Sequence, residues 1–153
     1  MNLNVTLRPA GSEDAADISE VFLVTRRDAL PDLPQVHTDD EVRTWIRDVV
    51  LPTATVWVAE TDGAIVGFFA LDGHMLDHLY VHPDYQRAQI GAVLLERARS
   101  LSPTHLELYT YAQNEGARRF YERHGFRAIA FGTDNEENLP DVLYEWRPSR
   151  SLR

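Results

Sequence analysis

One segment combines a strand, a turn and a helix start in an order that can bind an anion. The apolar residues Leu79 to Val81 are followed by a polar turn from His82 to Gln89, and a helical apolar pattern begins at Ile90. The first N–H groups of a helix have no partner inside it, and the helix dipole adds partial positive charge there. The sequence therefore predicts a phosphate-binding turn, with a turn that binds nothing as the alternative.

The charge balance limits how an anion could be held. The chain contains 24 Asp and Glu residues against 15 Lys and Arg residues, which gives a formal net charge of −9. A molecule of that sign repels the backbone of nucleic acids and anionic lipid, so we expect neither nucleic acid nor membrane as a partner. A phosphate ligand must therefore be held locally, by main-chain N–H groups and single basic side chains.

Cysteine and histidine usage narrows the remaining chemistry. The chain of 153 residues has no cysteine, so it offers no disulfide, no thiolate metal ligand and no thiol nucleophile. Its histidines lack the spacing of a metal motif, and we expect no metal ion. The histidines are His37, His74, His78, His82, His105 and His124. The first residues lack the basic segment and apolar run of a signal peptide, which predicts a cytoplasmic protein.

Hydrophobic periodicity and turn residues predict alternating strands and helices. The predicted strands span residues 3–8, 55–60, 64–71, 75–82, 106–109, 126–131 and 142–146. The predicted helices span residues 13–29, 39–49, 90–100 and 115–124. Antiparallel hairpins come first and a strand-helix-strand crossover follows, so the fold class is α/β of the mixed α+β kind. We expect a single domain over residues 1–147 with a loose tail over 148–153, built on a central mixed sheet of about seven strands with helices on both faces.

The second predicted helix has a clear start and an expected end. Thr38 and Glu41 have the spacing of a capping box, in which each residue's side chain accepts a hydrogen bond from the other's main chain. The sequence Leu51-Pro52-Thr53 is expected to end the helical pattern, since proline disfavours a helix interior.

The turn from Gln86 to Ala92 resembles the acetyl-coenzyme A signature of the GCN5-related N-acetyltransferases, the GNAT superfamily. That signature is Gln or Arg, two residues, Gly, one residue, and then Gly or Ala. Gln86 and Gly91 match its first and last positions, while Gln89 stands where the family has a central glycine. The residues after Gly91 are a small Ala92 and an apolar helix, as in the family.

A second stretch resembles the family's other signature, in which Asn is followed by Ala, Phe-Tyr and Gly-Phe. The matching residues here are Asn114, Ala117, Phe120-Tyr121 and Gly125-Phe126. The opening Leu7-Arg8-Pro9-Ala10 and the predicted element order also fit, so the resemblance covers nearly the whole chain.

The resemblance implies that the chain binds acetyl-coenzyme A as its acyl donor. Main-chain groups of Leu79 and Val81 would contact the acetyl and pantetheine end, and Asn114 would bond the pantetheine arm. The cradle for the pyrophosphate would consist of Gln86, Arg87, Ala88, Gln89, Gly91 and Ala92. If the position of Gln89 needs a positive φ, its Cβ costs ~1–2 kcal/mol, and its side chain crowds the phosphate.

Acyl transfer to an amine needs a neutral nucleophile, a polarised thioester and a proton for the leaving thiolate. By the resemblance, Tyr121 is the general acid; the alternative is a packed core tyrosine, just as Asn114 could instead cap a helix. For the base, His78 ranks slightly above Asp77 because histidine ordinarily titrates near neutral pH, and His74 ranks below both. Alternation along a strand lets at most one of His78 and Asp77 face the cleft, and a bulge would change which one.

The resemblance implies an enzyme, an acetyl-coenzyme A-dependent N-acyltransferase that acts on a primary amine of a small molecule or peptide. Direct transfer in a ternary complex is expected, because no cysteine is present to carry the acyl group. The alternative is a non-catalytic acyl-coenzyme A-binding or regulatory module, suggested by Gln89 and by Met75 at a position where some family members have a carboxylate.

The acceptor side is the least determined part of the sequence. Arg26, Trp45 and Tyr111 are candidates to line it, because in the family the first two helices and the last loops shape the acceptor site. The acids of residues 134–138 either form a solvated loop or draw a cationic amine to the site. Similar proteins are frequently dimers, so a homodimer is compatible with the resemblance.

Overall fold

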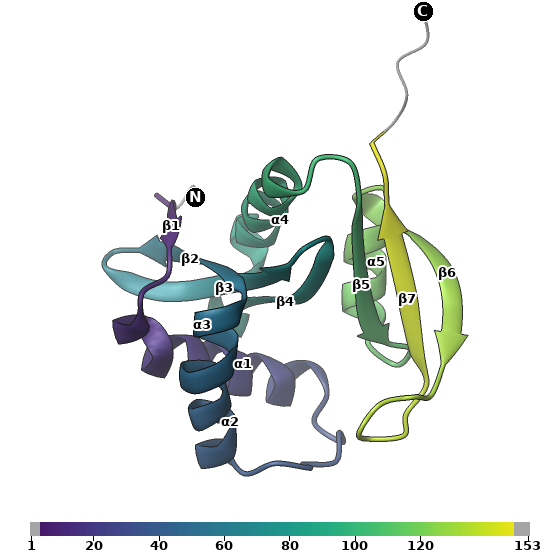
Figure 1. Ribbon diagram of the computed structural model, residues 1–153, viewed down its shortest axis with the longest axis horizontal. Helices are drawn as coiled ribbons and strands as arrows, with labels where there is room; N and C mark the ends of the chain where they lie inside the picture. Colours follow the sequence, from purple (N-terminus) through teal and green to yellow (C-terminus); the bar gives the residue numbers. More distant parts are fainter. Residues whose placement is uncertain (1–3, 149–153) are drawn as a thin grey trace, which may run out of the picture.

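A mixed sheet of seven strands runs through residues 4–148, the part of the chain that the computed structural model describes (Figure 1). Its order is β1-β2-β3-β4-β5-β7-β6. The strands are β1 Thr6–Pro9, β2 Thr55–Thr61, β3 Ala64–Asp72, β4 Met75–Val81, β5 Leu106–Tyr111, β6 Arg127–Gly132 and β7 Asp141–Trp146. The helices are α1 Ala15–Ala29, α2 Asp39–Trp45, α3 Leu51–Thr53, α4 Ile90–Leu101 and α5 Glu115–Arg123. The predicted fold class and element order are confirmed.

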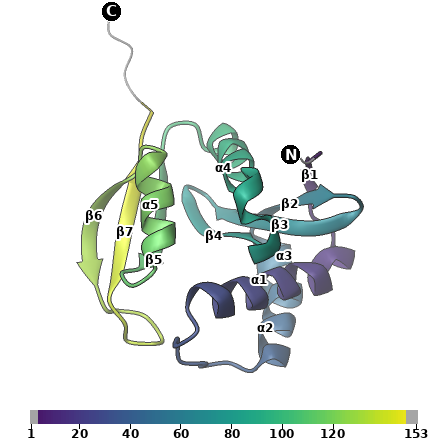
Figure 2. The same cartoon turned by 180° about the vertical axis from the view of Figure 1, so that it is seen from behind.

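The sheet has two antiparallel parts that meet where β4 lies beside β5. Strands β1 to β4 are antiparallel neighbours, and so are β5, β7 and β6. The parallel strands β4 and β5 share one register pair among the described residues, Met75 with Glu107. Beyond that pair the two strands diverge, and both views show the resulting wedge between the two parts (Figure 1 and Figure 2). We call the shared pair the vertex of the wedge.

Helices cover both faces of the β1–β4 part because an apolar cluster forms on each. On one face, Ile18 and Phe22 of α1 pack with Phe68 of β3. On the other face, Ile90 and Leu94 of α4 pack in a separate cluster. Strand β3 is covered on both faces, which explains why its residues from 66 to 71 are all buried and read as a continuous, mostly apolar run.

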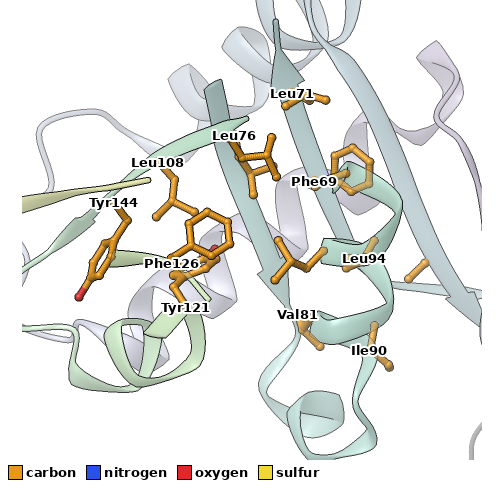
Figure 3. Packing of buried hydrophobic residues seen from close by; sticks show 14 of the residues in the cluster. Phe69, Leu71, Leu76, Val81, Ile90, Leu94, Leu108, Tyr121, Phe126 and Tyr144 are labelled. Carbon is orange, nitrogen blue, oxygen red and sulfur yellow. The ribbon is translucent and has the colours of Figure 1, made fainter. Parts of the chain in front are cut away.

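The α4 cluster continues across the wedge to the second part of the sheet. Figure 3 shows Leu76 of β4 beside Leu108 of β5, with Tyr121 and Phe126 completing the group. The hydroxyl of Tyr144 points away from this cluster and donates a hydrogen bond to Glu122 at 2.7 Å (Figure 3). The two parts of the sheet are therefore joined by apolar packing on one side of the wedge.

The second helical segment continues further than the sequence predicted. Thr38 and Glu41 form the predicted capping box. The expected break at Leu51–Thr53 is wrong, because a π-helical turn at Ile46–Val50 leads directly into α3. In this turn an N–H bonds a carbonyl five residues back. The wider turn accommodates Pro52, whose ring clashes with the carbonyl four residues earlier in a regular α-helix.

The predicted ends of the chain are only partly described. Residues 1–3, the start of the first predicted strand, and residues 149–153 of the predicted tail lie outside the described residues. The domain limits at 1–147 therefore stay a prediction. Within residues 4–148, no helix combines the length and the apolar character needed to cross a membrane.

Candidate active site

A cleft of about 1250 Å³ fills the wedge between β4 and β5. Its walls come from the end of α1, the length of β4 and β5, the start of α4 and the side of α5. Most of the predicted site residues line it, although they come from segments far apart in the chain. The predicted residues in its lining are Asp77, His78, Leu79, Val81, Gln86, Gln89, Gly91, Ala92, Asn114 and Tyr121.

The edge of β4 presents main-chain groups to the cleft. The N–H of His82 bonds the carbonyl of Val66 in β3 at 2.8 Å. Because peptide groups alternate in direction along a strand, those of Leu79 and Val81 point away from β3, into the wedge. The carbonyl of Val81 already accepts hydrogen bonds from Gln86 Nε2 at 2.9 Å and from a threonine of α1. The N–H of Val81 and both main-chain groups of Leu79 therefore face the cleft.

The turn before α4 has the geometry that the sequence predicted. A 3-10 helical turn at Pro83–Ala88 leads to Gln89, which has φ 62° and ψ 20° in the left-handed region. The condition considered from the sequence, a positive φ at a residue with a Cβ, is therefore present at Gln89. No side chain caps the helix start, so the first N–H groups of α4 point outward without a side-chain acceptor. The side chains of Arg87 and Ala88 lie outside the described residues.

Gly91 allows close packing between α4 and α5. A Cβ at this position would lie 3.3 Å from two ring atoms of Phe120, which is tighter than an ordinary van der Waals contact. The glycine therefore brings α5 against the first turn of α4. Next along α5, Tyr121 lines the same cleft.

Tyr121 lies at the bottom of the cleft among other rings. It is buried, with the ring centroids of Phe126 and Tyr144 at 5.3 and 6.5 Å. Its hydroxyl makes no hydrogen bond within residues 4–148, unlike that of Tyr144. Burial, with a smaller effect of Tyr80, raises the pKa of Tyr121 well above its ordinary range. The ring of Tyr121 therefore packs in the core, while its protonated hydroxyl lines the cleft.

Asn114 caps α5 instead of lying within it. Its Oδ1 accepts a hydrogen bond from the N–H of Ala117 at 3.2 Å, which corresponds to the alternative given by the sequence. Asn114 also lines the cleft. The cap uses the side-chain oxygen, so the side-chain NH₂ group remains available to a ligand.

A β-bulge brings both candidate bases to the cleft. His78 pairs with Ala70 and Leu76 pairs with Leu71, which leaves Asp77 as the extra residue of β4. The expectation that at most one of Asp77 and His78 could face the cleft is wrong for this reason, because the bulge breaks the alternation of the strand. His74 lies outside the cleft, in the turn between β3 and β4.

His78 is enclosed by aromatic rings on the α1 side of the sheet. The ring centroids of Phe22 and Trp45 are 5.6 and 5.3 Å away, and that of Tyr80 is at 5.8 Å. Nδ1 of His78 is buried and has no hydrogen-bond partner among the described residues. Burial, followed by the charge of Arg26, lowers the pKa of His78 to about 4. For Asp77, burial and then Asp72 raise the pKa.

Two of the residues expected to line the acceptor site, Arg26 and Tyr111, both contact Glu137. The hydroxyl of Tyr111 donates to Glu137 Oε1 at 2.5 Å, and Arg26 lies 3.7 Å from the same carboxylate. The side chain of Glu137 is 8% exposed. The alternative that residues 134–138 form a fully solvated loop is therefore wrong for Glu137, because contacts with Tyr111 and Arg26 keep its carboxylate buried. Burial raises the pKa of Tyr80 in the same group, a residue that sequence reasoning missed.

The two mouths of the cleft differ in charge. Near the start of α4, Arg119 and Arg123 of α5 line the opening. Near the end of α1 and the loop between β6 and β7, Asp28 and Asp134 line it together with Arg26, whose charge is balanced by Glu137. The basic mouth adjoins the free helix start, whereas the acidic mouth adjoins the acceptor-side group.

A wedge between two parallel strands, with a helix start at one mouth, offers main-chain donors to a phosphate-bearing ligand. The family model described as the acetyltransferase (GNAT) domain matches residues 52–128. The chain is 33% identical over 108 residues to the peptidyl-lysine N-acetyltransferase YiaC of Escherichia coli, covering 70% of this chain and 73% of that protein. It is 40% identical over 91 residues to the peptidyl-lysine N-acetyltransferase YjaB of the same organism, covering 57% and 61%.

Solved structures agree with this assignment. The solution structure of apo YjaB from Escherichia coli superposes with a TM-score of 0.79 at 26% identity, covering 94% of this chain and 98% of that chain. The PaiA N-acetyltransferase from Thermoplasma acidophilum, solved in complex with coenzyme A, shares the fold with a TM-score of 0.74 at 19% identity, covering 95% and 100%.

The chain belongs to the GNAT acetyltransferase family. It is an acetyl-coenzyme A-dependent N-acetyltransferase, which confirms the family and enzyme class predicted from the two signatures. The roles of the individual site residues stay predictions.

Proposed function

We propose that this enzyme transfers an acetyl group to the side-chain amine of lysine in a peptide or protein. The names of YiaC and YjaB support this acceptor. The charge of the cleft supports it independently, because a lysine ammonium is attracted to a mouth lined by Asp28 and Asp134.

One observation carries the proposal: the wedge connects a basic mouth beside a free helix start to an acidic mouth. An anionic donor and a cationic acceptor can then approach the same point from two sides. The net charge of −9 favours the cation over most of the molecular surface, so the local main-chain site is needed for the anion.

The donor side is proposed to bind acetyl-coenzyme A mainly through main-chain groups. The N–H groups at the start of α4, from Ile90 to Ala92, would hold the pyrophosphate, and the outward peptide groups of Leu79 and Val81 would hold the pantetheine arm. The NH₂ group of Asn114 would add one more donor. These groups fit the ligand because none needs to break an existing main-chain hydrogen bond to bind it.

Tyr121 is proposed as the general acid. Its raised pKa keeps the hydroxyl protonated throughout the neutral range, and the absence of a hydrogen-bond partner within residues 4–148 leaves the proton free to move. When the tetrahedral adduct collapses, the C–S bond breaks and Tyr121 donates its proton to the departing thiolate.

His78 is proposed to receive the proton of the amine. Its lowered pKa keeps the imidazole neutral at pH 7, and its ring lies on the α1 side of the sheet, from which the acceptor would enter. The nitrogen becomes far more acidic once it has attacked the thioester, so a weak base is sufficient at that stage. Asp77 is the second candidate, since it also lines the cleft.

The direct test is acetylation of a peptide panel by the purified chain. We expect acetyl-coenzyme A to bind and lysine peptides to gain one acetyl group by mass spectrometry, with basic-flanked peptides turning over faster than acid-flanked ones. Small polyamines serve as competing acceptors. Turnover on small amines alone would overturn the peptide proposal, and binding of acetyl-coenzyme A without any turnover would favour a non-catalytic module.

A further inference from the structure

A second cluster of chemically active side chains lies at the vertex of the wedge, outside the cleft. His74 lies in the turn between β3 and β4, while His105 and Glu107 lie at the start of β5. One donor atom from each residue lies within 4.8 Å of the other two. The turn that carries His74 points toward β5 in both views (Figure 1 and Figure 2). Two imidazoles and one carboxylate thus converge from segments that are remote in the chain.

The spacing of these donors is close to that of a tetrahedral zinc site. Zn–N and Zn–O bonds of about 2.0–2.2 Å at tetrahedral angles place two ligand atoms roughly 3.3–3.5 Å apart. The observed distances bracket that value, with His105 Nε2 at 3.1 Å and His74 Nε2 at 3.8 Å from the oxygens of Glu107. The rings of His74 and His105 are stacked, with centroids 4.5 Å apart and an interplanar angle of 20°, so at least one ring must rotate before both nitrogens point at one ion.

The carboxylate of Glu107 also has no Arg or Lys partner among the described residues. Its side chain is 21% exposed, and the groups within 4 Å of its carboxylate are the two imidazoles. The neighbouring Glu145 differs, because Arg127 and Arg147 each lie 3.4 Å from its carboxylate. A partly buried carboxylate beside two imidazoles is a set of ligands that suits a borderline-soft divalent ion.

We propose that His74, His105 and Glu107 bind one divalent transition-metal ion of the zinc class, with water in the fourth position. The ion would join the turn between β3 and β4 to the start of β5, where the two parts of the sheet share a single register pair in the described residues. The sequence predicted no metal because the histidines lack the spacing of a metal motif, and tertiary packing is what brings His74 to His105 and Glu107. The site is independent of the acetyl-transfer residues, since none of its ligands lines the cleft.

The test is titration of tag-free, chelator-treated protein with ZnCl₂ by isothermal calorimetry. We expect one ion per chain and a loss of affinity of about tenfold or more in His74→Gln and in His105→Gln, since changes even outside the ligand set cost 10–100-fold. Zinc at roughly a hundred times its dissociation constant should raise the melting temperature by about 5–10 °C. Hydrogen exchange should slow around residues 74–76 and 105–107.

His37→Gln provides the matched control, because His37 is exposed and remote from the cluster. Its zinc affinity should equal that of the wild type. Because His74 lies in an exposed turn, its substitution should leave the fold intact, which circular dichroism and acetyl-coenzyme A binding would verify. Zinc binding that is absent at about a hundred micromolar, or equal in the wild type and both cluster variants, would overturn the proposal.

Discussion

Tyr121 and Tyr144 lie in the same buried cluster, but their hydroxyl groups have different surroundings. Tyr144 is fully buried and its hydroxyl is saturated, since it donates to Glu122 and accepts from Arg118 at 3.0 Å. Tyr121 is nearly as buried, yet its hydroxyl has no partner within the described chain and lines the cleft. The Tyr121 hydroxyl is not among the fully buried polar atoms without a partner in the described chain, so it is accessible from the cleft and available to a ligand.

Tyr121→Phe is expected to lower kcat about 100-fold or more, because general-acid catalysis commonly contributes at least that factor. The dissociation constant of acetyl-coenzyme A and the melting temperature should change little, since the ring packing is kept. Tyr144→Phe is the matched control, and we expect it to lose about 1–2 kcal/mol of stability with kcat retained. Equal kcat in Tyr121→Phe and wild type, measured across pH, would contradict the acid role.

The enclosure of His78 predicts a pH dependence of stability. Its pKa is lowered from 6.5 to about 4 in the folded state, so between these values the unfolded chain binds the proton more tightly. The stabilisation is present above pH 6.5 and is lost as the pH falls through 4. The shift corresponds to roughly 3 kcal/mol.

His78→Phe keeps an aromatic ring among those that surround this position and removes the titrating imidazole. We expect its free energy of unfolding, measured by urea denaturation, to fall less steeply than that of the wild type between about pH 6.5 and 4. Every other titrating group is common to both proteins, so the difference between the curves isolates His78. Parallel curves would show that the imidazole titrates normally.

At the scale of elements, the turn into α4 combines backbone strain with the proposed pyrophosphate site. Gln89 adopts φ 62°, where a residue with a Cβ is destabilised by ~1–2 kcal/mol. The backbone adopts this conformation between a 3-10 turn at Pro83–Ala88 and α4, which hold the chain on both sides. The residue that departs from the family signature, Gln89, is therefore accommodated as local backbone strain.

Gln89→Gly is expected to raise the free energy of unfolding by about 0.5–1 kcal/mol, since relief of strain exceeds the extra entropy of glycine in the unfolded chain. Gln89→Ala keeps the strain and removes the side chain beyond Cβ, so it separates the two effects. Acetyl-coenzyme A affinity, measured by calorimetry, should rise in both variants if the side chain crowds the phosphate. A gain restricted to glycine would assign the effect to the backbone.

At the scale of the whole molecule, two polar contacts close the wedge at the acidic mouth. Arg26 at the end of α1 reaches Glu137 in the loop between β6 and β7. His37, in the loop after α1, lies 2.7 Å from Glu136 in that same loop. Both contacts connect the first part of the sheet to the second part, on the side opposite the α4 cluster. The acceptor would therefore enter past two polar contacts, one with the largely buried carboxylate of Glu137 and one with the exposed carboxylate of Glu136.

Glu137→Gln is expected to raise the KM for a lysine peptide about 5- to 30-fold, because losing this hydrogen-bonded charge costs about 1–2 kcal/mol and leaves Arg26 to repel the ammonium. The affinity for acetyl-coenzyme A should stay constant, since the donor is bound at the other mouth. Glu136→Gln, an exposed change in the same loop, should alter KM by no more than about twofold. Equal effects of the two variants in steady-state kinetics would exclude a specific role for Glu137.

Local signals in the sequence determined the order of the elements, the capping box at Thr38 and the two family signatures. Each depends on residues that are close in the chain, whose spacing alone sets the hydrogen bonds and the buried faces. Only the tertiary structure decided the bulge at Asp77, the burial of Glu137 and the meeting of His74 with His105. These features depend on how distant segments pack against one another, and no pattern within a single segment encodes that packing.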